Sequence, residues 1–164
     1  MFPTGSAVDS SPLVVDGIVY VGGEINSRPA FGAGNVYVGS ADGWLYAVNA
    51  GTDSIDWQRK TGAPISQSGP AVADGLVFVG SDDTKVHAFD EFSGEREWVR
   101  PTHGEVDSSP VVADGVVYIG SEDDQLYALS AVVNGVVYYG GQSRSMRDQD
   151  GGRYDRYATA SGCL

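Results

Sequence analysis

The chain has 164 residues, of which 22 are acidic and 10 are basic, so its formal net charge at pH 7 is −12 and its sequence pI is near 4.2. This length suits one domain with a buried core, and the acidity argues against a nucleic-acid partner because the phosphates would be repelled. The sequence has no apolar run long enough for a membrane-spanning helix, residues 1–12 show no signal peptide, and a single cysteine, Cys163, excludes an internal disulfide framework.

A glycine-bounded hexapeptide occurs five times along the chain. Its first copy reads Gly-Ile-Val-Tyr-Val-Gly, and successive copies begin 17, 41, 40 and 20 residues apart. The copies span residues 17–22, 34–39, 75–80, 115–120 and 135–140. A period near 40 residues with β-branched content is typical of β-propeller blades rather than of a helical solenoid.

Each hexapeptide is predicted to be the second strand of a larger unit. In one unit residues 110–113 form the first strand, and Asp114-Gly115 forms a turn that tolerates the positive φ angles of a type I′ hairpin. After the hexapeptide come a serine, an acidic turn and a third strand, residues 126–129. The third strands are apolar on both faces, as expected when neighbouring blades cover each side. We therefore predict an all-β fold of propeller-type blades built from antiparallel strands.

Two units continue into a fourth strand that carries a tryptophan. Residues 88–98 read Ala-Phe-Asp-Glu-Phe-Ser-Gly-Glu-Arg-Glu-Trp, and residues 47–57 follow the same pattern except at Asn49 and Asp53. This pattern resembles the pyrroloquinoline-quinone (PQQ)-like repeat family of β-propellers, whose blade motif is Ala-x-Asp-x-x-Thr/Ser-Gly-x-x-x-Trp. The resemblance covers roughly residues 8–141.

The resemblance implies which residues pack the blades together. In the family the tryptophan of the motif packs flat between adjacent blades, which implies this position for Trp57 and Trp98. A large ring beside small residues fills the gap between two sheets and buries a large area. The small residues expected to take part in this packing are the second-strand glycines Gly39, Gly80 and Gly120.

The repeats are not all complete. After Val21 the third and fourth strands are missing, and after Leu129 residues 131–133 are predicted to start a new hairpin in place of a tryptophan strand. About four blades' worth of strands remains, with two units incomplete, whereas single-chain propellers use about 4–8 blades. Three arrangements fit: an open arc, a small distorted propeller, or closure with a second copy. We favour an open or partly closed array, with self-association through its open blade edges as the second option.

Two regions of different composition divide the chain. Residues 1–141 are predicted to form the repeat domain. Residues 142–164 are polar, contain four arginines and lack both Val and Ile, so this tail is expected to be disordered rather than to form a degraded strand at residues 150–154.

The kind of charge is also unusual, because Asp supplies 16 of the 22 acids and Lys only 2 of the 10 bases. This pattern resembles haloarchaeal-type proteins, whose acidic surfaces depend on salt to screen self-repulsion. An acidic soluble domain without salt adaptation is the alternative that the composition leaves open.

The two histidines offer little chemistry. His87 occupies the position of Tyr46 and Tyr127 in the sister repeats, so a packed or half-buried role is favoured over catalysis. His103 lies in a loop between repeats. Neither histidine belongs to the spacing of a metal site or a catalytic triad, and no catalytic, metal-ligating or cofactor-binding residue is predicted.

Acidic turns such as residues 82–83 and 122–124 could attract Ca²⁺, but they lack the spacing of an EF-hand, and a solvated hairpin turn is the preferred interpretation. Trp44 stands where the sister repeats have Lys85 and Gln125, so the repeat does not explain it. It is the candidate contact for a protein partner, with packing under a neighbouring loop as the alternative.

The functional prediction combines the family resemblance with the incomplete repeats and the lack of predicted catalytic residues. PQQ-dependent dehydrogenases of the family are longer, hold the quinone and Ca²⁺ in a complete eight-blade ring and often use adjacent cysteines, none of which this chain has. Other relatives, such as the outer-membrane assembly lipoprotein propeller, are scaffolds, and relatives are mostly exported. We predict a non-enzymatic protein-binding or structural module without a cofactor, with a subunit or remnant of a PQQ-dependent oxidoreductase as the alternative. The partner and the compartment are left unassigned.

Overall fold

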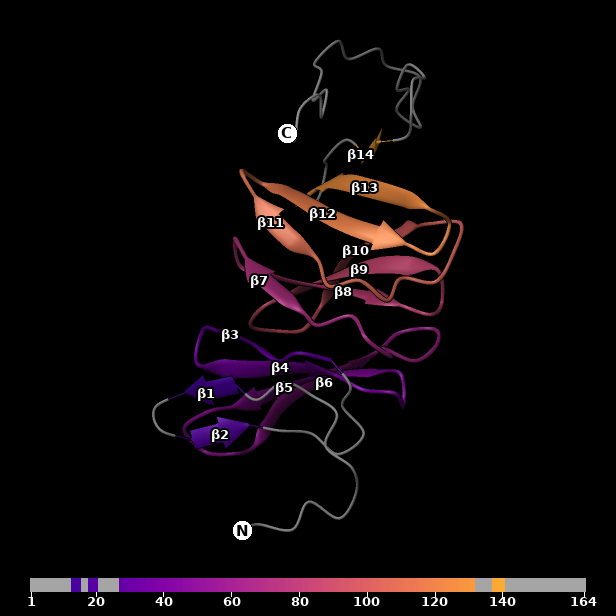
Figure 1. The fold of residues 1–164 in the computed structure, drawn as a ribbon. Coiled ribbons are helices and arrows are strands. Elements are labelled where there is room, and N and C mark those ends of the chain that lie inside the picture. Colours follow the sequence, from indigo (N-terminus) through magenta and orange to yellow (C-terminus); the bar gives the residue numbers. More distant parts are fainter. Residues whose placement is uncertain (1–12, 16–17, 21–26, 132–136, 141–164) are drawn as a thin grey trace.

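The computed structural model of the chain describes residues 13–15, 18–20, 27–131 and 137–140, and its regular elements within these ranges are all β-strands (Figure 1). In the same ranges no helix is long and apolar enough to cross a bilayer. The strands are β1 (Leu13–Val15), β2 (Ile18–Tyr20), β3 (Ala30–Gly32), β4 (Asn35–Gly39), β5 (Trp44–Asn49), β6 (Ile55–Lys60), β7 (Ala71–Ala73), β8 (Leu76–Ser81), β9 (Lys85–Asp90), β10 (Arg96–Pro101), β11 (Val111–Ala113), β12 (Val116–Ser121), β13 (Gln125–Ser130) and β14 (Val137–Gly140).

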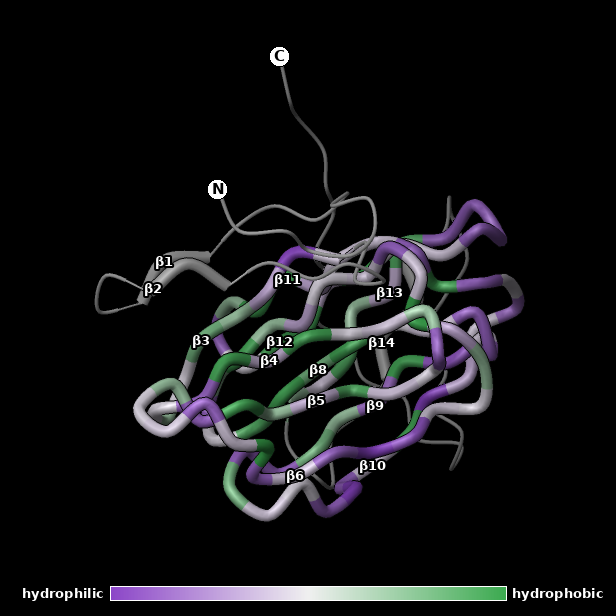
Figure 2. The backbone as a smooth tube through the Cα atoms, turned by 90° about the horizontal axis from the view of Figure 1, so that it is seen from below, coloured by the Kyte–Doolittle hydropathy of each residue, from purple (hydrophilic) through white to green (hydrophobic). Residues whose placement is uncertain are grey.

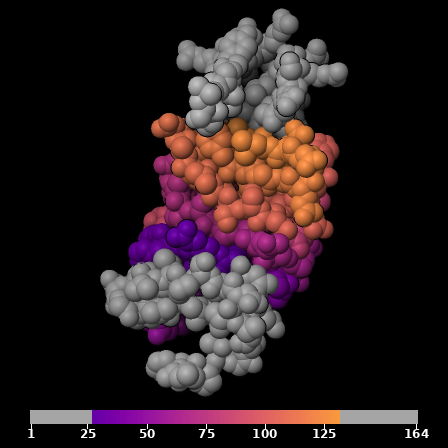
Figure 3. Space-filling view, viewed as in Figure 1, coloured from indigo at the N-terminus to yellow at the C-terminus, as the bar shows by residue number. Residues whose placement is uncertain are grey.

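These strands form one hairpin and three larger sheets. β1 pairs with β2, β3 to β6 form the first sheet, β7 to β10 the second sheet, and β11 to β14 the third sheet. Each sheet is antiparallel, with strands paired in chain order, and the three sheets stack face to face as successive bands of the molecule (Figures 1 and 3). The first strand of the second sheet, β7, contacts the first strands of the other two sheets, β3 and β11. The first strands therefore lie where the sheets approach each other, which in a propeller is the side that faces the central axis. Among the described strands the stack is not closed, and the predicted open array of propeller-type blades is confirmed.

Tight turns set the register of the first hairpin in each sheet. Asp74 and Gly75 have φ angles of 54° and 77°, and Asp114 and Gly115 have 51° and 72°. Positive φ at both central residues defines a type I′ turn, whose twist matches that of the strands it joins. The register follows directly, because the residues that flank the Asp74-Gly75 turn, Ala73 and Leu76, are paired.

The fifth hexapeptide requires a correction. It was expected to be the second strand of a new hairpin, but β14 pairs with β13, Val137 opposite Leu129 and Gly140 opposite Leu126. It therefore occupies the fourth-strand position that the tryptophan strands β6 and β10 take in the other two sheets. Three sheets, rather than two, have four strands. The unpaired edge of β13 explains the exchange, because any strand-forming segment that follows closely can complete its hydrogen bonding. The connection, residues 132–136, lies outside the described residues, as does the tail at 142–164.

Two layers of buried side chains hold the sheets together. Figure 2 shows that hydrophobic residues run through the middle strands, while β10 and the turns are largely hydrophilic. The second sheet contributes to both layers, so β8 and β9 are apolar on both faces. The layer between the first and second sheets contains Tyr37, Leu45, Ala47, Trp57, Ile65, Val77, Val79 and Phe89. The layer between the second and third contains Phe78, Val86, Ala88, Trp98, Val106, Val117, Ile119, Tyr127, Leu129 and Ala131.

Candidate functional site

Trp57 on β6 lies between the first two sheets and is 6% exposed. Its indole Nε1 donates a hydrogen bond to the carbonyl oxygen of Glu91 at 3.1 Å, and the Tyr37 hydroxyl donates to the same oxygen at 3.0 Å. Burial, and next the charge of Glu91, raise the pKa of Tyr37 to about 12, so the hydroxyl stays a neutral donor. A Cβ on Gly94 would lie 2.5 Å from the indole, so only glycine lets the turn after β9 contact the ring.

Trp98 on β10 has the equivalent place between the second and third sheets and is also 6% exposed. Its ring lies 5.7 Å from that of Phe78, and the Arg100 guanidinium lies 5.3 Å from its centre. The buried Nε1 of Trp98, however, has no hydrogen-bond partner among the described residues. By the repeat, the counterpart of Glu91 is Ala131, which the structure describes, but its carbonyl oxygen does not accept a hydrogen bond from Trp98.

The three glycines proposed to pack the blades differ in how closely they are approached. A Cβ on Gly39 would lie 2.3 Å from Cγ2 of Ile65, and one on Gly80 would lie 2.4 Å from Cγ1 of Val106. At Gly120 the nearest atom would be the Ser108 hydroxyl at 3.4 Å, an ordinary contact. Only Gly39 and Gly80 therefore allow a close approach that a side chain would prevent.

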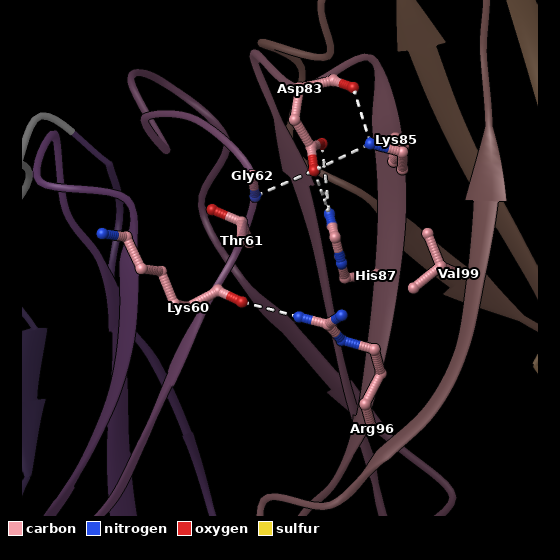
Figure 4. Close-up of a pocket in the computed structure, with 8 residues that line it drawn as sticks. All are labelled: Lys60, Thr61, Gly62, Asp83, Lys85, His87, Arg96 and Val99. Atoms are coloured by element: carbon pink, nitrogen blue, oxygen red, sulfur yellow. Dashed lines mark hydrogen bonds and ion pairs between the residues drawn. The ribbon is translucent and has the colours of Figure 1, made fainter.

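A polar groove opens where β6 of the first sheet faces β9 and β10 of the second (Figure 4). Its volume is about 400 Å³, within the range of small-ligand pockets. Two contacts bridge the sheets here: Arg96 donates to the carbonyl oxygen of Lys60 at 2.6 Å, and the Gly62 amide donates to Asp83 at 2.9 Å. The lining residues are Lys60, Thr61, Gly62, Asp83, Lys85, His87, Arg96 and Val99. We call this the Arg96 groove.

Asp83 and His87 form the most buried hydrogen-bonded pair in the Arg96 groove. Nε2 of His87 donates to the Asp83 carboxylate, 3.1 Å from each oxygen, and their side chains are 2% and 7% exposed. Lys85 adds an ion pair to Asp83 at 3.3 Å. Burial raises the pKa of Asp83, but the hydrogen bond and charge of His87, with donors from Gly62 and Lys85, outweigh it and hold this pKa well below its usual range. Asp83 is therefore ionised at neutral pH.

His87 takes the packed position expected from the repeat. Its ring stacks on Phe89, with centroids 6.0 Å apart and planes 6° from parallel. Nδ1 of the ring is buried and has no hydrogen-bond partner among the described residues. The ring behind the groove thus carries a buried nitrogen that the described part of the protein leaves unsatisfied, which is uncommon in protein interiors.

The corresponding place between the second and third sheets holds a tyrosine and a histidine. There the Tyr127 hydroxyl donates to Asp123 at 2.5 Å and lies 3.3 Å from Nδ1 of His103, whose own amide donates to Asp123 at 2.9 Å. At the Arg96 groove, the residue equivalent to Tyr127 is His87, and the residue equivalent to His103 is Gly62. The groove was not predicted from the sequence, although these two departures from the repeat were its signal.

The remaining candidates have local partners. Trp44 begins β5, is half-buried, and has the Lys60 ammonium 5.7 Å from its ring centre. His103 is exposed, and its Nδ1 lies 3.8 Å from Asp123. Asp42 and Asp123, in two of the acidic turns, accept hydrogen bonds from a backbone amide two residues on and a tyrosine four residues on. Those contacts are typical of solvated hairpin turns.

Comparison with known families then gives the evolutionary relationship. A protein-family model described as outer membrane protein assembly factor BamB matches residues 41–150, which is more than half of the chain. The chain belongs to this family. The PQQ-like repeat resemblance seen in the sequence is thereby confirmed, whereas the haloarchaeal-type resemblance is not shown. No curated protein sequence matches the chain significantly.

Solved structures place the chain in the same architectural class. BamB from Moraxella catarrhalis is 16% identical, with a TM-score of 0.70 over 84% of this chain and 51% of its own length. The quinohemoprotein alcohol dehydrogenase ADHIIG from Pseudomonas putida HK5 is 21% identical, with a TM-score of 0.60 over 69% of this chain and 20% of its own. The computationally designed protein Ika8 is 19% identical, with a TM-score of 0.57 over 63% and 32%. These likenesses show the fold alone, and the chain spans about half the length of the BamB structure.

A quinone on the axis would need particular residues on this BamB-family chain. PQQ carries three carboxylates and is held with Ca²⁺, so cations and a set of oxygen ligands should face the axis. The first strands β3, β7 and β11 contain only Ala, Val, Phe and Gly. Across the described residues no three or more His, Cys, Asp or Glu side chains form a group that could hold a metal ion. The described residues do not fit the quinone there, and no chemistry is derived through it.

Proposed function

We propose that the chain is a non-enzymatic β-propeller repeat module that acts as a protein-binding scaffold. Membership of the BamB family and the open stack of sheets both support a role in protein interaction. The observation that carries the proposal is the outward face of the third sheet, where large apolar side chains are exposed to solvent.

The repeat shows what this face is suited to bind. Tyr118 and Leu126 on the third sheet are 37% and 56% exposed, whereas their counterparts on the second sheet, Phe78 and Val86, are fully buried beneath the third sheet. Val111, paired with Tyr118, is 63% exposed. Apolar patches of this kind mark interaction sites in soluble proteins. The equivalent face of the second sheet is covered by the third sheet. A sheet of a partner, either another protein or a second copy of this chain, would cover the exposed face of the third sheet in the same way.

The test compares two charged substitutions at equally prominent apolar side chains. Leu126→Glu alters the proposed face, while Phe92→Glu alters a residue that is 72% exposed in the turn after β9, away from it. Self-association is measured by sedimentation velocity over a wide concentration range, and the binding of other proteins by capture from a native extract. We expect Leu126→Glu to weaken the observed association at least tenfold and Phe92→Glu to leave it unchanged. Equal association by all three proteins, or strictly monomeric protein that captures nothing reproducibly, would overturn the proposal.

An oxidoreductase subunit or remnant remains the alternative function. The likeness to the quinohemoprotein alcohol dehydrogenase supports it only at the level of the fold. Titration of the protein with PQQ and Ca²⁺ separates the two proposals, because a bound quinone has its own absorbance band. A saturable band at a ratio of one quinone per chain would replace the scaffold proposal.

A further inference from the structure

We propose that the Arg96 groove binds a carboxylate of an acidic peptide segment in a protein partner, with Arg96 and Lys85 as the contacting cations. This inference rests on the proposed function, because it gives the scaffold a second contact and states its chemistry. The groove lies at the junction of the first two sheets and is separate from the exposed face of the third sheet (Figures 1 and 4).

The first support is an excess of positive charge in an acidic protein. The chain has a net charge of −12, yet the side chains of Arg96 and Lys85, together with the backbone of Lys60, line this one groove. In the part of the chain that the structure describes, no carboxylate lies within ion-pair distance of Arg96 or Lys60. Figure 4 shows the Lys60 ammonium directed away from the groove, so Arg96 is the cation left uncompensated inside it.

The second support is the hydrogen-bonding capacity that remains. The exposed guanidinium of Arg96 makes one hydrogen bond, to the Lys60 carbonyl oxygen, and this bond orients the group at the groove. A guanidinium has five donors in a planar fork that matches a carboxylate. Lys85, whose side chain is 41% exposed, lies toward the other end of the groove, where its ammonium contacts Asp83 and no other residue that the structure describes.

The third support is that two of the residues lining the groove, Gly62 and His87, depart from the repeat. A Cβ on Gly62 would lie 2.7 Å from Oδ2 of Asp83, so a side chain there would displace the carboxylate that His87 and Lys85 hold. Histidine at position 87 is shorter than the tyrosine of the sister repeats, which fills the equivalent space beside Asp123. Both changes put a smaller residue at a position that lines the groove.

A carboxylate fits this groove better than a phosphate does. Asp83 is already neutralised by its neighbours, which leaves roughly one free positive charge, that of Arg96, facing the groove. A singly charged group balances that charge, while a phosphate group, with a charge of about −1.5 to −2 at pH 7, would leave negative charge unbalanced in the groove.

The test uses a tetraglutamate peptide as the probe and a tetraglutamine peptide as its uncharged control. Binding is followed by NMR through the Arg96 Nε and Gly62 amide signals of the labelled full chain. Arg96→Gln removes the proposed contact, and Arg100→Gln makes the same charge change on the same strand beside Trp98. His87→Tyr restores the residue of the sister repeats and should fill the groove without disturbing the fold. Thermal melting checks that each variant is folded.

We expect saturable shifts with tetraglutamate that weaken at least fivefold in Arg96→Gln and in His87→Tyr, and by less than twofold in Arg100→Gln. Inorganic phosphate should compete poorly. Equal binding by all variants, equal binding of tetraglutamine, stronger binding of phosphate, or no shift at Arg96 would overturn the inference. If Leu126→Glu still abolishes partner association while Arg96→Gln does not affect it, the scaffold proposal stands and only the groove proposal fails.

Discussion

Trp57 and Trp98 occupy the same place in consecutive sheets but differ in what the indole nitrogen contacts. Trp57 donates to the Glu91 carbonyl and packs on Gly94, so its indole contacts the turn between β9 and β10 of the next sheet. Trp98 is equally buried, yet its nitrogen lacks a partner within the described ranges. The two tryptophans should therefore stabilise the fold by similar burial but by different amounts of hydrogen bonding.

This difference can be measured by two kinds of substitution. Trp98→Ala should lower the free energy of unfolding by about 3–5 kcal/mol, the usual cost of removing a large buried aromatic. Replacement by Phe should cost about 1 kcal/mol more at Trp57 than at Trp98, because only Trp57 loses a hydrogen bond that the structure describes. Urea unfolding of the three variants gives these values. A near-neutral Trp98→Ala would show that the side chain is exposed.

Asp83 is expected to contribute stability that depends on pH. Its folded pKa lies below its unfolded value, so its contribution is fully present above about pH 4 and is lost as the pH falls further. Asp83→Asn should cost about 1–3 kcal/mol at pH 7, because His87 and the Gly62 amide lose a charged acceptor. The difference in melting temperature between wild type and variant should shrink from pH 5 to pH 2. Asp114→Asn, at an exposed turn, is the charge-matched control, and a difference for Asp83→Asn that stays constant with pH would contradict the ionised pair.

Second strands β4, β8 and β12 place a glycine at the same position but need it to different degrees. Gly80→Ala would push a methyl group against the Val106 carbonyl oxygen, 2.5 Å away, and should cost about 1–3 kcal/mol. Gly120→Ala meets nothing closer than 3.4 Å and should be neutral or stabilising by about 0.5 kcal/mol, because alanine is favoured over glycine in a strand. Chemical unfolding of both variants measures the two free energies, and Gly120→Ala serves as the control for Gly80→Ala. Equal losses would mean that the backbone, rather than the approach of Val106, requires the glycine.

The strands themselves were predictable from local signals. Type I′ turns at positions such as Asp74-Gly75 fix the first hairpins, and a 40-residue period then places the remaining strands. The prediction for the fifth hexapeptide was wrong because its sequence matches that of a second strand. Its pairing is instead determined by tertiary structure, since the free edge of β13 lies next to it. The Arg96 groove was missed for a related reason. His87 was explained within one repeat and Gly62 was not singled out, but the groove arises where the two meet across two sheets.

The molecule as a whole brings many like charges close together. Burial, and next the charges of Asp82 and Glu122, raise the pKa of Asp107, which shows that acids from neighbouring sheets repel one another. Glu105 also contributes to this shift. Because the net charge is −12, such repulsion should act across much of the surface and oppose the folded state.

Salt should therefore stabilise the protein, and removing charge should substitute for salt. Screening lengths fall from about 10 Å at 0.1 M to about 3 Å at 1 M, so the melting temperature should rise by about 3–8 °C between low and molar NaCl. The double variant Glu105→Lys with Glu122→Lys, both at exposed positions, changes the net charge from −12 to −8. It should melt above the wild type at low salt, and the gap should close at 1 M NaCl. KCl should act like NaCl, since screening depends on ionic strength. A melting temperature that does not rise with salt would count against both the repulsion and the haloarchaeal-type interpretation of the composition.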